Sequence, residues 1–574
     1  MNPKRRTLMA LTRRALGGIT IGGSAALTLA ACGGNEGGSG NGAGKEEITW
    51  AVASGWASWN LNTSTGSNSY LQQASTPMNP SGQTGGDFDG NAEYHYDDAL
   101  FASEPELVSE EPMTVKYVLN EKAQWSDGNP VRVEDFIFHW YSVSGNEDHA
   151  DQEKALPAST NWGPNVADIV QQDDGSIHVV YIDGYSDPEW LFSPCLYLPS
   201  HLADANGFEG WQDDPAVMGE AIAWFEETPP TVGTGPYKPV DAKMGEHIIY
   251  EINENYQGSI KPTIKKVTMK VVEGTEAIVT AIRNGEIDGA WPSEFSEEEN
   301  SKIAEDPAIK TEVYPGSIWL HIDCNTKGLL SDVELRKAVF TAIDSADIVA
   351  KNYPESGLEP KGNHFFANAS EYYVDYVTPT GQGTGDIAAA TAILEAAGYT
   401  GIGDALMTPE GEAVKLTFRY GEGDATRTTA GELTQAYLAE LGIEVELKSI
   451  ADGDLGPVLA GADFDLIIFG WSGNAAFTLA PNQYFLSTSE SNYGKYESAA
   501  ADEAIAKVRS TFDIAEAAEF TNAVDEIVVP DAYTLPLFDE PQTYYAVSTV
   551  LEGPGANGYS QSGPIWNIRE WKTI

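Results

Sequence analysis

Basic side chains are scarce in this chain. Of its 574 residues, 33 are Lys or Arg and 86 are Asp or Glu, which gives a net charge of −53. Contacts to nucleic-acid phosphates need basic patches, so this balance excludes a nucleic-acid partner. The acids are spread over the whole chain, which indicates a solvated, self-repelling surface. Adaptation to high salt, which screens such repulsion, stays open as a second interpretation. Attraction of cationic ligands does not explain why acidic residues are spread over the whole chain.

Residues typical of catalytic and metal sites are few and badly spaced. Three cysteines are too few for a disulfide framework, and the eight histidines are scattered without metal-ligand spacing. Serine hydrolases carry a Gly-x-Ser-x-Gly turn, but in Gly470-Trp471-Ser472-Gly473 the second glycine comes one position too soon. We therefore predict that the chain is not an enzyme and holds neither cofactor nor metal.

Long hydrophobic runs are also missing. The stretch Ala15 to Ala31 is short and interrupted by glycines, so it is weak for a membrane-spanning helix. It follows a basic segment containing Arg13-Arg14 and ends in Leu29-Ala30-Ala31-Cys32, and residues 1–32 are therefore predicted to be an export signal. The arginine pair resembles a twin-arginine signal, with Sec export as the alternative. The ending resembles a lipobox, which implies cleavage before Cys32 and a diacylglycerol on its thiol.

The mature chain is predicted to begin with a tether and to continue as a large folded body. Removal of residues 1–32 takes away five positive charges and no acids, which leaves −53 − 5 = −58. The Gly-rich residues 33–46 are predicted to link the lipid flexibly to the body. The chain is 42% hydrophobic and 10% aromatic, and its length suits two to four domains.

The most informative local pattern runs from Thr114 to Trp140. Alternating apolar residues from Val115 to Leu119 predict a strand. The run Ser126 to Pro130 predicts a turn, because Gly and Pro supply backbone angles that other residues avoid. Acidic residues in a first turn, followed by apolar residues at helical spacing, predict a helix from Val133 to Trp140.

The literal sequence of this stretch resembles the signature of the family 5 extracellular solute-binding proteins, the oligopeptide- and dipeptide-binding receptors of ABC importers. The matching residues are Tyr117, Leu119, Trp125, Ser126, Asp127, Gly128, Pro130, Asp135, Phe138 and Trp140. Arg132 departs from the family's usual Thr at the helix N-cap, a loss of about 1 kcal/mol. Ordered matches between about Glu47 and Phe538 include Gly233–Tyr237, Gly285–Asp288, Leu320–Val349, Ser491–Tyr493 and Leu535–Phe538.

The resemblance implies an α/β, two-lobed periplasmic-binding-protein (Venus flytrap) fold with an extra subdomain in the first lobe. Domain I of lobe 1 is predicted at residues 47–95, 228–318 and 536–574, and domain II of lobe 1 at 96–227. Domain III, which is lobe 2, is predicted at 319–535. Cys195 and Cys324 fall in different lobes. A disulfide between them would restrict opening, so we expect two buried thiols.

Local patterns predict further elements. Val180 to Ser200 carries aromatic residues and prolines at strand-like spacing. In lobe 2, strands at 414–420 and 443–449 alternate with helices at 386–399 and 429–440. Such a rhythm is typical of a mainly parallel sheet covered by helices.

The stretch Asp465 to Phe485 is the most informative about the ligand. An apolar strand ends at Gly470, and ligands tend to bind beyond the carboxyl ends of such strands. In the family's peptide receptors a Trp-x-x-Asp at this place grips the peptide's α-ammonium. Trp471 and Ser472 match, but Asn474 stands at the Asp position. An amide oxygen still accepts a hydrogen bond, but the charge-assisted part, roughly half of its strength, is missing.

Other candidate ligand-binding residues are aromatic, because such rings bury a ligand while keeping polar tips. Core packing is the alternative for Trp56, as it is for the neighbouring Trp59. The complete predicted ligand-binding set is Trp56, Tyr420, Trp471, Ser472, Asn474 and Tyr484.

The resemblance implies an exported receptor that acts as a monomer and is held at the outer face of the cell membrane by its lipid anchor only. It would capture peptides between closing lobes and deliver them to ABC permease and ATPase subunits. Three alternatives stay open. The same fold could bind an oligosaccharide, a glycolipid headgroup or a metal chelate. The chain could instead be a lipoprotein that regulates envelope assembly, or an exported hydrolase.

Overall fold

The computed structural model describes residues 45–80, 85–154, 156–159, 161–192, 198–293, 295–354, 356–451, 455–473 and 475–574. The predicted signal, Cys32, most of the tether, Cys195 and Asn474 lie outside these residues. Cys324 is a buried free thiol, and its burial raises its pKa. Among the described residues, no helix combines the length and apolar character needed to cross a membrane.

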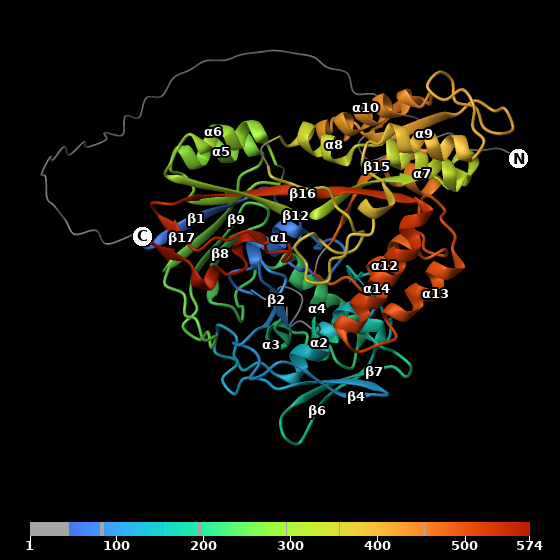
Figure 1. Ribbon diagram of the computed structural model, residues 1–574. Coiled ribbons are helices and arrows are strands. Elements are labelled where there is room, and N and C mark those ends of the chain that lie inside the picture. The colour runs from blue at the N-terminus through green and yellow to red at the C-terminus, as the bar shows by residue number, and fades with distance from the viewer. Residues whose placement is uncertain are drawn as a thin grey trace, which may run out of the picture. The chain divides into compact units, whose positions relative to one another are not determined.

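A ten-stranded sheet runs through both lobes (Figure 1). Its strands lie in the order β14, β13, β15, β12, β16, β11, β1, β10, β9, β8. Their bounds, in that order, are Glu444–Ile450, Lys415–Gly421, Leu466–Ser472, Ile309–Cys324, Thr534–Val547, Gly289–Trp291, Glu47–Val52, Lys266–Val271, His247–Ile252 and Tyr237–Lys243.

The sheet is mixed. Parallel pairing joins β13 to both β14 and β15, and β1 to both β10 and β11. The pairs β15–β12, β12–β16 and β16–β11 and the run β10–β9–β8 are antiparallel. The prediction of a mainly parallel sheet in lobe 2 is therefore right for strands β14, β13 and β15. It is wrong for β12 and β16, which complete the sheet in that lobe by antiparallel pairing. These two strands arrive from the first lobe and return to it, so they do not follow the local alternation of strand and helix.

The long strands β12 and β16 connect the lobes. Ile309 to Pro315 pairs with Pro541 to Val547 on the first-lobe side, and pairing resumes at Trp319 with Asp539 on the second-lobe side. Between them the register shifts, which leaves Gly316 to Ile318 outside the β12–β16 ladder. A Cβ at Gly316 would lie 2.7 Å from Gln542 Cγ, so the close approach of the strands requires glycine here.

Helices cover both lobes. Along one side of the large sheet Figure 1 shows α5 (Thr275–Arg283), α6 (Glu297–Ala304), α7 (Val333–Ala342), α8 (Ser345–Asn352), α9 (Ile387–Ala396) and α10 (Ala425–Glu440). The other side carries α1 (Ser69–Ser75), α12 (Ala480–Phe485), α13 (Ala499–Val508) and α14 (Ile514–Val528). The short helix α11 (Leu455–Gly461) precedes β15.

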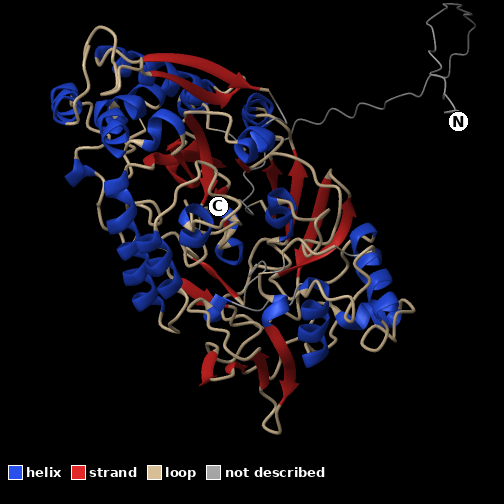
Figure 2. Ribbon diagram, turned by 90° about the vertical axis from the view of Figure 1, so that its right-hand side faces the viewer, coloured by secondary structure: helices blue, strands red, loops and turns tan. Residues whose placement is uncertain are grey.

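A smaller four-stranded sheet stands apart from the large one (Figure 2). Its order is β4 (Glu106–Glu110), β5 (Met113–Tyr117), β7 (Ile177–Tyr181) and β6 (Val166–Gln171). The helices α2 (Val133–Val143), α3 (Ser200–Ala205) and α4 (Pro215–Glu227) accompany it in sequence. Short hairpins pair β2 (Gly86–Phe88) with β3 (Tyr94–Tyr96) and β17 (Leu551–Glu552) with β18 (Lys572–Thr573).

The hydrophobic cores are separate, as expected for two lobes and a subdomain. A first-lobe core contains Trp50, Tyr237, Tyr250 and Trp571, and the small sheet has its own core around Trp125. A second-lobe core gathers residues such as Leu335, Phe340, Phe418 and Leu466. Large buried apolar areas of this kind supply most of the stabilisation of each part. The residue limits given above for the three domains stay a prediction.

The signature stretch is held by one buried carboxylate. Asp135 Oδ2 accepts from the Trp125 Nε1–H at 3.2 Å and from the Arg132 N–H at 2.9 Å. Its Oδ1 accepts from the backbone N–H of Ser200 at 2.9 Å and from its hydroxyl at 2.7 Å. Burial raises the Asp135 pKa. Asp135 thus ties the turn at Ser126–Pro130 to α2 and α3, so this part of the signature stretch has a structural role.

Most predicted local elements are present with shifted ends. The helix predicted at 429–440 begins at Ala425, because Asp424 accepts a hydrogen bond from the Arg427 N–H and caps it. The prediction of strand-like structure from Val180 to Ser200 is wrong for the described residues beyond Tyr181: a 3₁₀ turn occupies Trp190–Phe192, and α3 begins at Ser200. Two aromatic residues of this stretch contact the second lobe instead, since Trp190 Nε1–H donates to the Phe512 carbonyl and Arg509 donates to the Tyr185 hydroxyl.

Candidate functional site

Three cavities meet around the register shift of β12. All three touch Gly558, and two of them touch Ser317. A Cβ at Gly558 would lie 2.5 Å from Pro315 O, so the C-terminal segment passes directly over the crossing strand. The cavities are lined from both lobes, which places the candidate site in the cleft between them.

The first of these, the neutral cavity, has a volume of about 420 Å³. It is lined by α1 and the residues before it, by the carboxyl ends of β11 and β15, by β12 and β16, and by residues 558–561. Five side-chain amides, several serines including Ser472, and two aromatic rings dominate the lining. The amides belong to Asn68, Gln72, Gln73, Gln542 and Gln561, and the rings to Tyr70 and Trp291. Within the described part of the chain, none of its lining residues carries a charge.

Several polar atoms of the neutral cavity are buried without a partner. Gln72 and Gln73 are 3% and 6% exposed, although amides are usually at the surface. Among the described residues, no group bonds Gln72 Oε1, Gln73 Oε1 or Trp291 Nε1. Buried polar groups in proteins are normally paired, so each of these three side chains, which line the cavity, has a group that a ligand or water would complete once the side chain turns toward the open space.

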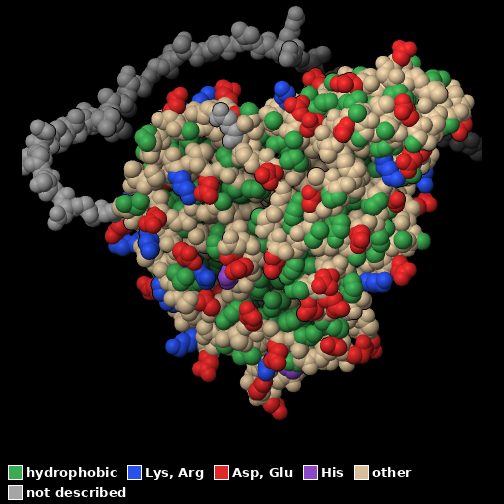
Figure 3. All heavy atoms as spheres, in the orientation of Figure 1, with side chains coloured by type: hydrophobic (Ala, Val, Ile, Leu, Met, Phe, Trp, Pro, Cys, Tyr) green, Lys and Arg blue, Asp and Glu red, His purple; other side chains and the backbone are tan. Residues whose placement is uncertain are grey.

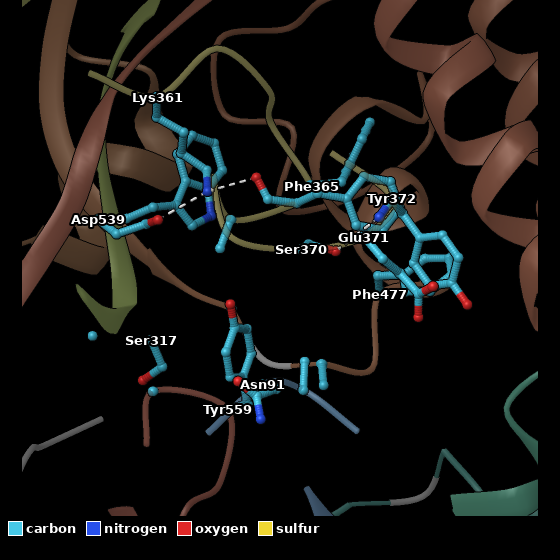
Figure 4. A pocket seen from close by; sticks show the side chains of 18 residues that line it. Asn91, Ser317, Lys361, Phe365, Ser370, Glu371, Tyr372, Phe477, Asp539 and Tyr559 are labelled. Atoms are coloured by element: carbon cyan, nitrogen blue, oxygen red, sulfur yellow. Dashed lines mark hydrogen bonds and ion pairs between the residues drawn. The ribbon is translucent and has the colours of Figure 1, made fainter. Parts of the chain in front are cut away.

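The second cavity, of about 80 Å³, is aromatic and contains one ion pair (Figure 4). Lys361 Nζ donates to Asp539 Oδ1 and to the Phe366 carbonyl, both at 2.9 Å. Both charged side chains are largely buried, at 3% and 12% exposure. Phe365, Phe366, Tyr372, Phe477 and Tyr559 also line this cavity. Lys361 is therefore neutralised within the protein rather than left for an anionic ligand.

The third cavity, again of about 420 Å³, lies against residues 313–315 of β12. Among its described lining residues the charged ones are Glu359 and Asp539, both acidic. The surface around the cleft is acidic as well, and Figure 3 shows Asp and Glu side chains dispersed over the visible face rather than gathered in one patch. An anionic solute would therefore meet repulsion at long range and no unpaired cation among the described lining residues.

The lobes also touch away from the cavities, at what we call the Glu189 contact. Glu189 Oε1 accepts from the backbone N–H groups of Phe477 at 2.6 Å and Thr478 at 2.9 Å. Nearby, Arg509 forms an ion pair with Asp187 at 3.1 Å. Desolvation between the lobes raises the Glu189 pKa. Because Phe477 also lines the aromatic cavity, this contact closes the cleft beside the candidate site.

The structure places the predicted ligand-binding residues in different surroundings. Ser472 lines the neutral cavity. Trp471 and Tyr484 stack on each other with ring centroids 4.9 Å apart, in a second-lobe aromatic cluster beside the cavities. Trp56 is buried in the first-lobe core, 5.7 Å from the ring of Trp59. Tyr420 packs half-buried against the second-lobe core. Ligand binding by these residues, and by Asn474, stays a prediction.

Sequence reasoning missed the polar residues of the first lobe. Gln72 and Gln73 sit between Leu71 and Ala74, which are both core residues. Two adjacent amides within so short a buried helix were a signal of a polar site on its inner side. Trp291 is the last residue of β11, which directly follows the Gly285–Asp288 match, and so it lies at a carboxyl strand end where ligands tend to bind. Lys361 gave no signal, since its partner Asp539 is far away in sequence.

Fold and cleft together define a class of protein: a two-lobed solute-binding protein whose lobes enclose the ligand site. Comparison with known proteins agrees. Residues 98–493 match the family of bacterial extracellular solute-binding proteins, family 5 (middle region). The chain belongs to this family, as its sequence signature predicted. Family members are non-enzymatic binding proteins for transport that act outside the cytoplasm.

Relatives of known name bind peptides. The oligopeptide-binding protein OppA of Mycobacterium tuberculosis is 27% identical over 470 residues, which cover 80% of this chain and 75% of OppA. The oligopeptide-binding protein AppA of Bacillus subtilis is 25% identical over 358 residues, covering 59% of this chain and 62% of AppA.

Solved structures share the fold but hold varied ligands. The periplasmic EDTA-binding protein EppA superposes with a TM-score of 0.79 at 25% identity, covering 93% of this chain and 98% of EppA. NikA from Brucella suis, solved with Fe(III)-EDTA, gives a TM-score of 0.71 at 17% identity, covering 92% of this chain and all of NikA. The predicted two-lobed fold is thereby confirmed, and the ligand must be argued from the site.

Proposed function

We propose that this protein is a lipid-anchored extracytoplasmic receptor that captures peptides between its lobes and delivers them to an ABC permease. The observation that carries the proposal is the neutral cavity, where five side-chain amides of the first lobe and Ser472 of the second offer donors and acceptors together. Peptide units present one N–H and one C=O each, and an extended peptide bound through them is recognised with loose side-chain specificity. The names of the relatives support the same class of solute.

Closure follows from where the cavity lies. A ligand there contacts α1 and β11 of the first lobe and Ser472 of the second. It therefore binds the closed state better than the open state and shifts the population toward closure. Delivery requires that the permease recognise this closed state. Mutation of the first-lobe amides is expected to weaken binding without preventing the unliganded protein from folding.

The lipid anchor rests on the sequence of residues 1–32. Cleavage before Cys32 and acylation of its thiol would hold a chain of the family at the outer face of the membrane. Metabolic labelling with radioactive palmitate tests this directly. Wild-type protein is expected to carry label in the membrane fraction, and Cys32→Ser to carry none. Label on both proteins would contradict acylation at Cys32.

Native mass spectrometry on the soluble mature form, with Cys32 removed and purified from its own host, tests the ligand class. Extra mass that fragments into amino acids over several lengths is the expected result. A single discrete non-peptide mass would replace peptide by a dedicated solute. Light scattering on the same sample is expected to give the mass of a monomer.

A second candidate is a neutral non-peptide solute such as an oligosaccharide. The uncharged side chains among the described lining residues of the neutral cavity and the rings of Tyr70 and Trp291 favour it, since sugars combine hydroxyl groups with apolar faces. Anionic metal chelates fit the described lining poorly, because Lys361 is already paired with Asp539.

A further inference from the structure

We propose that the neutral cavity binds an uncharged stretch of the ligand, so that peptides with blocked termini bind as tightly as peptides with free termini. The inference rests on the proposed peptide-receptor function and assigns the recognition to Gln72, Gln73 and Trp291. It departs from the recognition of the α-ammonium by a carboxylate that the family resemblance implies for receptors with Asp where this chain has Asn474.

The first argument is charge. Charged residues make up 21% of the chain, yet none of the described residues that line the neutral cavity carries a charge. A peptide terminus enclosed there would be an unpaired charge removed from water, which is strongly unfavourable. In the adjoining aromatic cavity, Lys361 and Asp539 are committed to each other.

The second argument is the set of unpaired atoms. Gln72 Oε1 and Gln73 Oε1 are acceptors, and Trp291 Nε1–H is a donor, and all three are buried without a partner among the described residues. A ligand with at least two donors and one acceptor would complete them. Main-chain amides supply both kinds of group without charge. An ammonium group supplies donors alone, and a carboxylate supplies acceptors alone.

The third argument is preorganisation. α1 is anchored by Leu71 and Ala74, which are fully buried in the first-lobe core. Asn68 caps the helix by accepting from the N–H groups of Tyr70 and Leu71. The glutamines are therefore held at the cavity by elements that a ligand does not have to order, which lowers the entropic cost of binding.

The test is calorimetric titration of one uncharged-side-chain pentapeptide, either with free termini or N-acetylated and C-amidated. Kd values within about threefold of each other are expected. A blocked peptide that binds more than about tenfold more weakly than the free one would overturn the inference and leave the receptor function intact. If neither form binds, the receptor function fails. The molecule that copurifies then decides: an uncharged compound supports the inference, and an ionised one overturns it.

Variants separate a ligand contact from a structural role. Gln73→Met keeps the size of the side chain and removes its buried, unpaired carbonyl. We expect the affinity for the blocked peptide to fall about tenfold, while the melting temperature of the unliganded protein stays the same or rises. A lower melting temperature with unchanged affinity would mean that Gln73 is structural. Gln172→Met, at an exposed turn of the small sheet, is the matched control and is expected to change neither.

Discussion

Replacing Glu189 by alanine is expected to open the cleft. In the closed form its Oε1 accepts from two backbone N–H groups of the opposite lobe, those of Phe477 and Thr478. Alanine leaves both donors without an acceptor. An unpaired buried donor costs about 1–3 kcal/mol. Loss of the carboxylate also removes its desolvation cost, so we take about 2 kcal/mol for the pair of donors.

This free energy converts into affinity. A change of about 2 kcal/mol shifts the equilibrium between open and closed states about 30-fold. If the free protein is mainly open, the Kd of a cleft ligand rises by the same factor, because the ligand must supply the lost closing energy. Calorimetry measures the Kd, and pulsed electron–electron distance measurements between spin labels on the two lobes measure closure. Glu209→Ala removes an exposed first-lobe carboxylate and is the matched control.

Charge and pH give a second readout of the same contact. The Glu189 pKa is raised by desolvation in the closed state and is ordinary once the lobes separate and water returns. In the closed state Glu189 therefore binds a proton more tightly than in the open state. Closure strengthens as pH falls through the raised pKa and is weakest above it. Glu189→Gln keeps an acceptor and no charge, so it is expected to bind as tightly as wild type or tighter, without this pH dependence. Wild-type affinity and closure in Glu189→Ala would refute the reasoning.

The remaining predictions concern stability and specificity. Burial lowers the His139 pKa from 6.5 to about 4. The stability that neutral His139 gives the folded protein is therefore present above pH 6.5 and is lost as pH falls toward 4, by up to about 3 kcal/mol. Urea unfolding at several pH values is expected to show that His139→Gln lacks this acid sensitivity. Asp135→Ala removes the acceptor for four donors and is expected to destabilise the protein by about 3 kcal/mol, with thermal unfolding as the assay and exposed Glu134→Ala as a weak control. Asn474→Asp is expected to make a free peptide bind about tenfold more tightly than its N-acetylated form, and equal titration curves would remove Asn474 from the site. Trp471→Ala is expected to weaken ligand binding about tenfold, with Trp471→Phe as the control for its packing on Tyr484.

The fold was predictable because its signature residues stabilise the structure. Trp125 and Asp135 bond to each other across the turn they enclose, so their spacing is fixed by geometry and is readable as a string. Helices such as α5 and α9 were predictable from local periodicity. The mixed character of the large sheet was not, because β12 and β16 pair residues more than two hundred positions apart.

The site was predictable only where a strand end marks it. Ser472 is the last residue of the apolar strand β15 and lines the neutral cavity. Trp56 has the same composition signals as a cleft residue, but the neighbouring Trp59 and the first-lobe core enclose it. The adjacent amides Gln72 and Gln73 were a local signal of a polar site, but only tertiary packing places them at the cavity that Trp291 also lines. Single-residue chemistry cannot show which polar groups end up without a partner.

The shifted register of β12 decides what sets the cost of opening. Gly316 to Ile318 lie outside the β12–β16 ladder, so a rotation of the lobes about them would leave the backbone bonds between these two strands in place. The segment stays joined to the second lobe, because Ile318 pairs with Ser472 and the Gly473 N–H donates to the Ser317 carbonyl at 2.6 Å. We therefore expect the strand pair to bend, and the opening energy to come from Glu189 and from the side chains that face each other across the cleft. Substitutions at those places are expected to change the ligand affinity over a wide range while the ten-stranded sheet stays unchanged.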